Sequence, residues 1–163
     1  MTNQLEGKIA VVTGGSRGIG EMITSGFLAN GVKVYISARK APALIDKANE
    51  LSEKYGIACI PVPCDLSSME GINEFVEIIE KKEEGIDFLI NNAGAAWGEP
   101  LESFSEKGWD KVMDLNVKSI FFLTQKFKTL LTKNATEEDP SRVINIGSID
   151  GLNVPAMETY PYG

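Results

Sequence analysis

Short apolar, β-branched runs alternate along the chain with longer segments whose apolar residues recur at helical spacing. The short runs are typical of buried strands, and we expect strands at 8–13, 32–37, 57–62, 87–90 and 142–146. The spacing predicts helices at 19–30, 43–55, 67–84 and 107–133, the first three followed by glycines. Strands joined by such helices predict right-handed crossovers, and therefore a parallel α/β sheet covered on both faces.

Length and composition indicate one soluble globular domain spanning 1–163. The chain has 163 residues, 43% of them hydrophobic, and a net charge of −7. Because an acidic chain binds phosphate backbones poorly, nucleic acid is not an expected partner. The N-terminus lacks a basic signal region and the apolar runs are too short to cross a bilayer, so we expect no membrane partner and a cytoplasmic location.

The residues that are missing or rare exclude some chemistry. The chain has no histidine, which rules out a Ser-His-Asp triad and a histidine-ligated metal site. Two cysteines are too few for a structural zinc site, and no metal is expected. Cys59 and Cys64 lie five positions apart in or beside the third predicted strand, which points them to opposite faces as buried, reduced thiols.

A glycine-rich turn separates the first predicted strand from the first helix. Glycines there permit a tight turn and a close approach of a pyrophosphate, while the helix N-terminus offers free N–H groups. The spacing is G-x-x-x-G-x-G, and its position between strand and helix predicts phosphate binding. The residues expected to bind are Gly14, Ser16, Arg17, Gly18, Ile19 and Gly20.

The end of the second strand indicates which dinucleotide binds. An Asp or Glu there would select NAD by bonding the ribose 2′-hydroxyl, but no acid occurs between Glu21 and Asp46. Arg39, with Arg17 from the glycine turn, could instead neutralise the 2′-phosphate of NADP. The alternative is that both are ordinary surface arginines.

Four motifs in order resemble the short-chain dehydrogenase/reductase family. They are Thr13 to Gly20, Asn91-Asn92-Ala93-Gly94, Asn116 in the long helix, and Ser148 after the fifth strand. The resemblance covers essentially the whole chain and implies a Rossmann-type, doubly wound parallel sheet. Within the family, Trp97-Gly98 and the run from Arg142 to Ser148 are similar to bacterial 3-oxoacyl-[acyl-carrier-protein] reductases, including the kind associated with rhamnolipid synthesis.

The resemblance implies roles for individual residues. Ser148 would bond the substrate carbonyl while a tyrosine passes it a proton, and Asn116 would help to hold a water in the proton relay. A phenol needs nearby positive charge to titrate near neutrality, which the family supplies from a lysine four residues after the tyrosine. On the cofactor side, Asp65 and Leu66 would border the adenine, and the remaining residues would line the cofactor and stabilise the sheet: Asn91, Asn92, Ala93 and Gly94.

Tyr160 and Tyr162 compete for the role of the catalytic tyrosine. Tyr162-Gly163 matches the start of the family's Tyr-Gly-x-Ser-Lys motif and lies 14 positions after Ser148, so Tyr162 is preferred. Tyr160 is then a packing or pocket residue. Trp97 and Met157 could face the substrate, although core packing explains such residues equally well.

The catalytic lysine, the last two strands and the substrate loop of the family have no counterpart within the 163 residues. We therefore interpret the chain as an N-terminal fragment with its sheet truncated after the fifth strand. That strand would be an exposed apolar edge, and the helix face with Ile120, Phe121 and Leu123 would lose partners, which predicts marginal stability or aggregation.

Two functions remain open. The first is an NADP-dependent reductase of a 3-oxoacyl thioester, free or carried on an acyl carrier, or of another ketone, acting as a homodimer or homotetramer when intact. The second is a nucleotide-binding module without turnover.

Overall fold

Five parallel strands form one sheet in the order β3-β2-β1-β4-β5, in a computed structural model that describes residues 5–152 and 158–162. The strands are β1 (Ile9–Thr13), β2 (Lys33–Ala38), β3 (Cys59–Pro63), β4 (Phe88–Asn91) and β5 (Arg142–Asn145). The order runs outward from β1 in both directions, as the doubly wound prediction requires.

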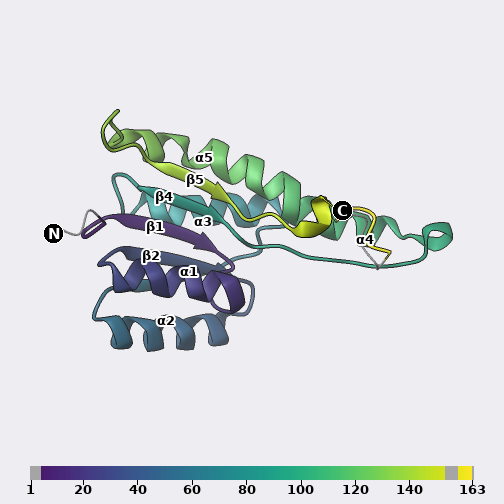
Figure 1. Cartoon of the computed structure of the whole chain (residues 1–163), viewed down its shortest axis with the longest axis horizontal. Helices are drawn as coiled ribbons and strands as arrows, with labels where there is room; N and C mark the ends of the chain where they lie inside the picture. The colour runs from purple at the N-terminus through teal and green to yellow at the C-terminus, as the bar shows by residue number, and fades with distance from the viewer. Residues whose placement is uncertain (1–4, 153–157, 163) are drawn as a thin grey trace.

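Helices cover both faces of this sheet (Figure 1). On one face lie α1 (Gly18–Ala29) and α2 (Ala41–Tyr55), and on the other lie α3 (Met69–Glu80) and α5 (Ser119–Lys133). Alternate residues of β1 divide between the two cores: Val11 packs with α3 and α5, while Ala10 and Val12 pack with α1 and α2. Single-turn 3₁₀ segments lie at Leu101–Ser103 and Ile149–Gly151.

The predicted long helix is continuous but not uniform. It consists of α4 (Glu106–Met113), a π-helical turn at Asp114–Lys118, and α5. The other helices match the prediction to within a few residues, and the largest difference is α3, which is shorter at both ends. Its start is fixed by Ser68, whose hydroxyl accepts a hydrogen bond from the N–H of Gly71.

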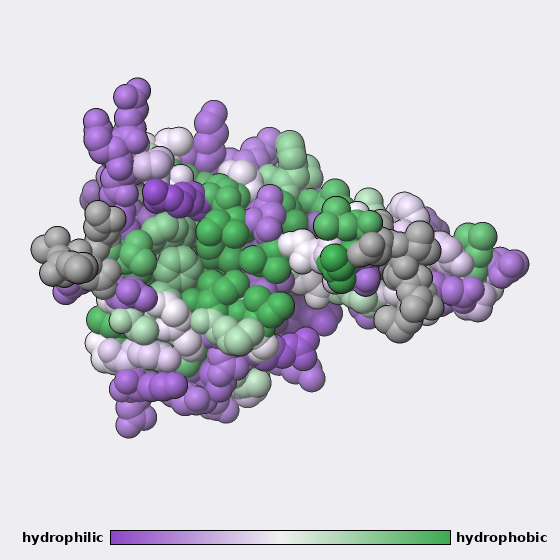
Figure 2. Space-filling view, in the orientation of Figure 1, coloured by the Kyte–Doolittle hydropathy of each residue, from purple (hydrophilic) through white to green (hydrophobic). Residues whose placement is uncertain are grey.

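β5 forms one edge of the sheet, as predicted. Val143, Ile144 and Ile146 are 40%, 42% and 37% exposed. Figure 2 shows hydrophobic side chains gathered over the middle of the same view in which β1, β4 and β5 face the reader. The edge therefore presents apolar side chains and unpaired backbone groups together.

The prediction for the α5 face is right for one residue and wrong for another. Phe121 is 62% exposed, but Leu123 is only 1% exposed. Leu123 lies two positions further round the helix, on the face that packs with Phe75 and Phe127 in the core. Ile120 is half-buried between these two extremes.

The two cysteines lie on opposite faces of the sheet, which confirms the prediction from their spacing. Cys59 belongs to the core under α1 and α2, and Cys64 to the core under α3 and α5. Both are free and buried, and burial raises the pKa of each thiol to about 12.

Candidate active site

The carboxyl ends of the strands place the predicted site residues at one edge of the sheet. The chain order reverses between β1 and β4, and in open α/β sheets ligands bind in a crevice at such a point, so we expect the cofactor there. The glycine turn follows β1, Arg39 follows β2, the Asn91–Gly94 motif follows β4, and Ser148 follows β5. The structure thus gathers residues that are far apart in the sequence.

The glycines of the turn are required for two different reasons. Gly14 and Gly18 have φ of 65° and 55°, which side-chain-bearing residues rarely adopt. At Gly20, a Cβ would overlap the carbonyl oxygen of Gly14 and come within 2.5 Å of the Asn92 Nδ2 atom. The first turn of α1 therefore lies directly against the loop. We call the backbone of this turn, from Gly14 to Gly20, the cradle.

The N-terminus of α1, like that of α2 after Lys40, has no side-chain cap. Ser68 and Ser105 cap α3 and α4 with side-chain hydrogen bonds, whereas Arg17, the N-cap of α1, makes none. The first N–H groups of α1 are consequently left to an anion, which the positive end of the helix dipole also favours.

Thr13 and Asn92 join the glycine turn to the segment after β4. The Thr13 Oγ1 atom accepts hydrogen bonds from the N–H groups of Asn92 and Ala93, both 2.9 Å. The Asn92 side-chain amide donates to the carbonyl oxygens of Thr13 and Gly14, at 2.9 and 3.3 Å. Asn92 therefore shapes the cradle by fixing its backbone rather than by projecting into it.

Arg17 and Arg39 are both exposed at this edge. Asp65, after β3, bonds the hydroxyl and N–H of Ser67, and these bonds, together with the charge of Arg39, lower the pKa of its carboxyl. No ion pair between Arg39 and Asp65 forms within the described part of the chain. Leu66 points into the core, so only its backbone can border a ligand.

Asn91 is buried between β4 and β5 and serves the sheet. Its Nδ2 atom donates to the Oδ1 atom of Asn145, at 2.9 Å, and bridges the two strands beside their main-chain pairing. Its own Oδ1 atom is buried and has no hydrogen-bond partner among the described residues.

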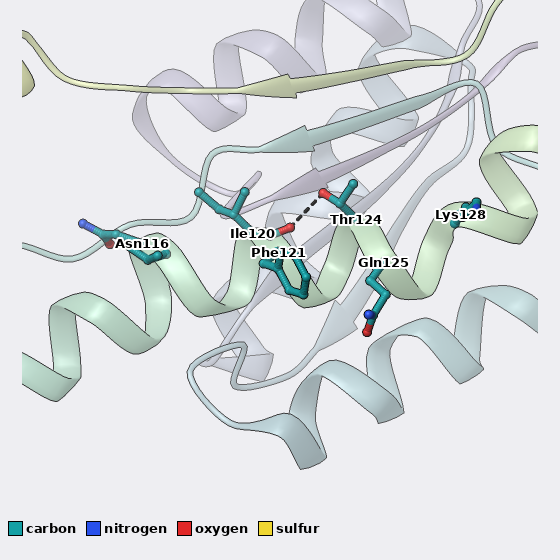
Figure 3. A pocket seen from close by; sticks show the side chains of 7 residues that line it. Asn116, Ile120, Phe121, Thr124, Gln125 and Lys128 are labelled. Carbon is teal, nitrogen blue, oxygen red and sulfur yellow. Dashed lines mark hydrogen bonds between the residues drawn. The ribbon is translucent and has the colours of Figure 1, made fainter.

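Asn116 lies in the π-helical turn and clamps the loop after β4. Its Oδ1 atom accepts from the N–H of Ala95 at 2.8 Å, and its Nδ2 atom donates to the Ala95 carbonyl at 2.9 Å. Figure 3 shows it at one end of a row of side chains, with Ile120, Phe121 and Thr124 following along the helix. That row lines a shallow, mostly apolar hollow of about 630 Å³. A role for Asn116 in a water relay stays a prediction.

The two tyrosines have different surroundings. Tyr160 is exposed and packs edge-on against Phe104, and its pKa is raised by partial desolvation and by the charges of Glu158 and Glu102. Tyr162 is half-buried, and its N–H donates to the Thr159 carbonyl at 2.8 Å. Acidic neighbours disfavour the phenolate, which agrees with a packing role for Tyr160.

Ser148 lies three residues after β5 and caps the 3₁₀ segment Ile149–Gly151. Its Oγ atom accepts from the N–H of Asp150 at 3.2 Å, which leaves the hydroxyl proton unused by that bond. Met157, which with Trp97 could face the substrate, lies outside the described residues. Trp97 is described, and it packs against α4 rather than standing alone in the loop.

Sequence reasoning missed two contributors to the site. Thr13 was read as the last residue of a strand, yet its hydroxyl organises the crevice. Asn145 accepts a hydrogen bond from Asn91, which lies 54 positions earlier in the sequence, on the neighbouring strand. Both are polar residues at the carboxyl end of a strand that is mostly apolar, and this pattern is visible in the sequence.

Residues 5–152 and 158–162 contain neither a candidate metal site nor a helix that could span a membrane. No group of histidine, cysteine and acidic side chains there could hold a metal ion. No helix of that part is long and apolar enough to cross a membrane.

A parallel sheet that reverses its order at a glycine-rich turn defines a Rossmann-type α/β protein. A family profile described as short chain dehydrogenase matches residues 8–163. The chain therefore belongs to the short-chain dehydrogenase/reductase family, as its motifs predict.

Named relatives place the chain more closely within that family. It is 47% identical over 159 residues to the rhamnolipids biosynthesis 3-oxoacyl-[acyl-carrier-protein] reductase of Pseudomonas aeruginosa, covering 98% of this chain and 61% of that protein. A solved RhlG/NADP active-site complex from the same organism is 46% identical with a TM-score of 0.92, over 99% of this chain and 62% of that one. An L-sorbose reductase of Gluconobacter frateurii, solved with NADPH and L-sorbose, is 28% identical with a TM-score of 0.88, over 97% of this chain and 59% of that one.

The chain thus spans about three fifths of the length of these proteins. These matches confirm the expected sequence similarity to 3-oxoacyl-[acyl-carrier-protein] reductases.

Proposed function

We propose that this chain is the cofactor-binding part of an NADP-dependent carbonyl reductase whose substrate is a 3-oxoacyl thioester or another ketone. The observation that carries the proposal is the bare cradle at the uncapped N-terminus of α1, held against β4 by Thr13 and Asn92. The relatives whose names state a reductase activity support the reaction class.

A dinucleotide phosphate fits the residues of this cradle. A Cβ at Gly20 would collide with the Gly14 carbonyl and distort the cradle, and the N–H groups at the start of α1 lack a side-chain cap. Arg17 and Arg39 would pair with the extra phosphate of NADP, and the related RhlG and L-sorbose reductase structures were solved with NADP and NADPH. When bound, NADPH supplies the hydride.

The chain's own residues would bind and orient the carbonyl. The hydroxyl of Ser148 would donate a hydrogen bond to the substrate oxygen, and the phenol of Tyr162 would deliver a proton to that oxygen. Asn116 fixes the backbone at Ala95, on the loop that borders the crevice. For the whole protein we further propose a cytoplasmic location, no nucleic-acid or membrane partner, and a homodimer or homotetramer.

The second candidate is a nucleotide-binding module without turnover. It is favoured by the share of the relatives that the chain spans, 61% of the Pseudomonas aeruginosa reductase and 62% of the RhlG chain, because the glycine turn expected to bind the cofactor lies within that share.

Calorimetric titration tests both candidates, and turnover assays on the whole protein test the roles proposed for Ser148 and Tyr162. Both predict NADPH binding by the 163-residue chain, and an absence of binding by folded chain would refute both. In the whole protein, Ser148→Ala and Tyr162→Phe are expected to reduce kcat by about 10²–10⁴-fold while leaving the NADPH Kd unchanged. Tyr160→Phe is the matched control and should keep near-normal kcat. If Tyr160→Phe is the inactive variant, the assignment of the tyrosines is reversed.

A further inference from the structure

The segment that carries Tyr162 is held by the loop between β4 and α4. Glu99 donates its N–H to the Glu158 carbonyl at 3.2 Å. A Cβ at Gly98 would lie 3.4 Å from the same oxygen and 3.6 Å from the Thr159 Cγ2 atom, so the two backbones are in close contact. Residues 158–162 thus return to a loop that they follow by about sixty positions.

Two further contacts extend this attachment. The rings of Phe104 and Tyr160 pack edge to face with centroids 5.7 Å apart. Tyr162 then bonds back to Thr159, which is itself buried. The position of the Tyr162 backbone therefore follows the position of the loop at Gly98 and Glu99.

The loop is itself anchored at Trp97, next to Gly98. The indole lies against Gly108 in the first turn of α4, where a Cβ would overlap its Cδ1 and Nε1 atoms and come 3.1 Å from Cγ. The Lys111 ammonium lies 4.1 Å from the ring centroid, one turn further along the helix. The ring thus packs at a position that any side chain at residue 108 would block.

Gly108 is costly unless this contact requires it. A glycine inside a helix is less favourable than alanine, and Gly108 has an ordinary helical φ, so the backbone does not demand it. The Trp97 side chain also lowers the pKa of the Glu99 carboxyl by hydrogen bonding, after the larger effect of the bonds to Ser105, so the ring interacts with the loop residue that bonds Glu158. Both features indicate that the position of the Trp97 ring is fixed.

Two further contacts attach the loop on either side of Trp97. Asn116 clamps Ala95, and the N–H of Ser105 donates to the Glu99 Oε2 atom at 2.7 Å. Between these two attachments the indole is the one large side chain that seats the loop on α4. Its contact therefore sets how far Gly98 and Glu99 stand from the helix.

We propose that Trp97, seated on Gly108, is a positioning residue that places the Glu158–Tyr162 segment, and with it the tyrosine of the reaction. The placement of the segment stands on the contacts above, and its catalytic consequence rests on the proposed function. The loop would then be attached at two points. Asn116 bonds Ala95, and α4 packs against Trp97.

The test uses the 163-residue chain with Trp109→Phe, which leaves Trp97 as its single tryptophan. Gly108→Ala is expected to raise acrylamide quenching of Trp97 about twofold or more, and to speed hydrogen exchange at the Glu99 and Tyr162 amides about tenfold. Gly26→Ala is the matched control, because Gly26 also lies inside a helix and a Cβ there meets nothing within 4 Å. It should change neither signal.

A double-mutant cycle keeps the proposal testable if Gly108→Ala does not fold. Trp97→Ala removes the ring without a clash and should release the same two amides. Adding Gly108→Ala to Trp97→Ala should then release them no further, because the Cβ no longer meets an indole. Unchanged Tyr162 exchange in Trp97→Ala, unprotected Tyr162 in the parent chain, or additive effects in the double variant would each overturn the proposal.

NADPH titration of the same variants separates this proposal from the function on which it partly rests. Binding within about twofold of the parent is expected for Gly108→Ala, because the cradle is built on α1 and β1. If no variant binds NADPH but the amides remain coupled to Trp97, the proposed function fails and the positioning contact stands. If NADPH binds and the coupling is absent, the reverse holds.

Discussion

Asn92 donates two hydrogen bonds to Thr13, from its N–H to Oγ1 and from its Nδ2 atom to the backbone carbonyl, both 2.9 Å long. The two residues are 79 positions apart and end neighbouring parallel strands. Their contact is what turns two separate sequence motifs into one crevice, since it fixes the glycine turn against the segment that borders Asn116.

Removal of the Thr13 hydroxyl should therefore destabilise the fold as well as the site. Thr13→Val keeps the shape but leaves the N–H groups of Asn92 and Ala93 without an acceptor in a buried place. We expect a loss of about 2–4 kcal/mol in the free energy of unfolding, measured by urea denaturation. Thr132→Val, at an exposed helix position, makes the same substitution and should change stability by less than about 0.5 kcal/mol. Equal effects of the two changes would contradict the role given to Thr13.

The glycine cradle can be tested without altering any charge. Gly20→Ala places a Cβ against the Gly14 carbonyl, so the turn and α1 must separate. We expect the NADPH Kd to rise about tenfold or more, corresponding to about 1.4 kcal/mol or more. Gly26→Ala lies later in the same helix with open space around it, and should bind NADPH normally while gaining about 0.5–1 kcal/mol in stability. Unaltered binding by folded Gly20→Ala would remove the basis for the cradle.

The sequence predicts well those parts of the molecule that depend on local pattern. Apolar runs and glycine stops locate the five strands and the helices that join them, and residues such as Cys59 and Cys64 fall on the predicted faces. The motif after β1 is likewise recognisable, because a glycine turn between a strand and a helix needs no distant partner to form.

What could not be predicted depends on contacts between distant segments. The π-helical turn that aims Asn116 at Ala95 has the same apolar spacing as its flanking helices. Arg39 has no acid near it in sequence, yet Asp65 from the next strand is close enough for their charges to interact. Leu123 and Phe121 are two residues apart, and only the packing of α5 decides which one is buried.

The buried thiols predict how stability depends on alkaline pH. Burial raises the pKa of Cys59 and Cys64 from 9.0 to about 12, so the folded state retains both protons longer than the unfolded state. Below pH 9 both states are protonated and the thiols give no pH dependence, but between about pH 9 and 12 stability falls as pH rises. The slope should be about 1.4 kcal/mol per pH unit for each thiol.

Urea denaturation across this range, in the parent and in Cys59→Val with Cys64→Val, measures that slope. The double variant should lose most of it, and the remainder should come from Tyr35, whose pKa is also raised by burial and by its hydrogen bond to Glu83. A slope that does not change on replacing both cysteines would show that the thiols are not responsible.

The choice of cofactor is tested by reversing one charge. Arg39→Asp replaces a cation that would hold the 2′-phosphate with an acid that repels it and can bond a ribose hydroxyl. We expect the ratio of the NADH Kd to the NADPH Kd to fall by about tenfold or more, measured by calorimetry. Arg142→Asp makes the same change at the opposite end of the sheet and should leave the ratio unaltered. If the parent binds NADPH no more tightly than NADH, the argument from Arg17 and Arg39 fails.

The β5 edge predicts that the 163-residue chain associates with itself. The N–H groups of Arg142 and Ile146 bond β4-side carbonyls, so those of the alternate residues, including Val143, point outward from the last strand of the sheet. Val143→Lys places a charge on this edge and should shift sedimentation toward the monomer at concentrations where the parent forms larger species. Ile45→Lys, a similar change at an exposed position of α2, should leave association as in the parent, because it does not touch the edge. A monodisperse parent chain with a sharp melt at high temperature would contradict this prediction, since an unprotected apolar edge should then have had no consequence.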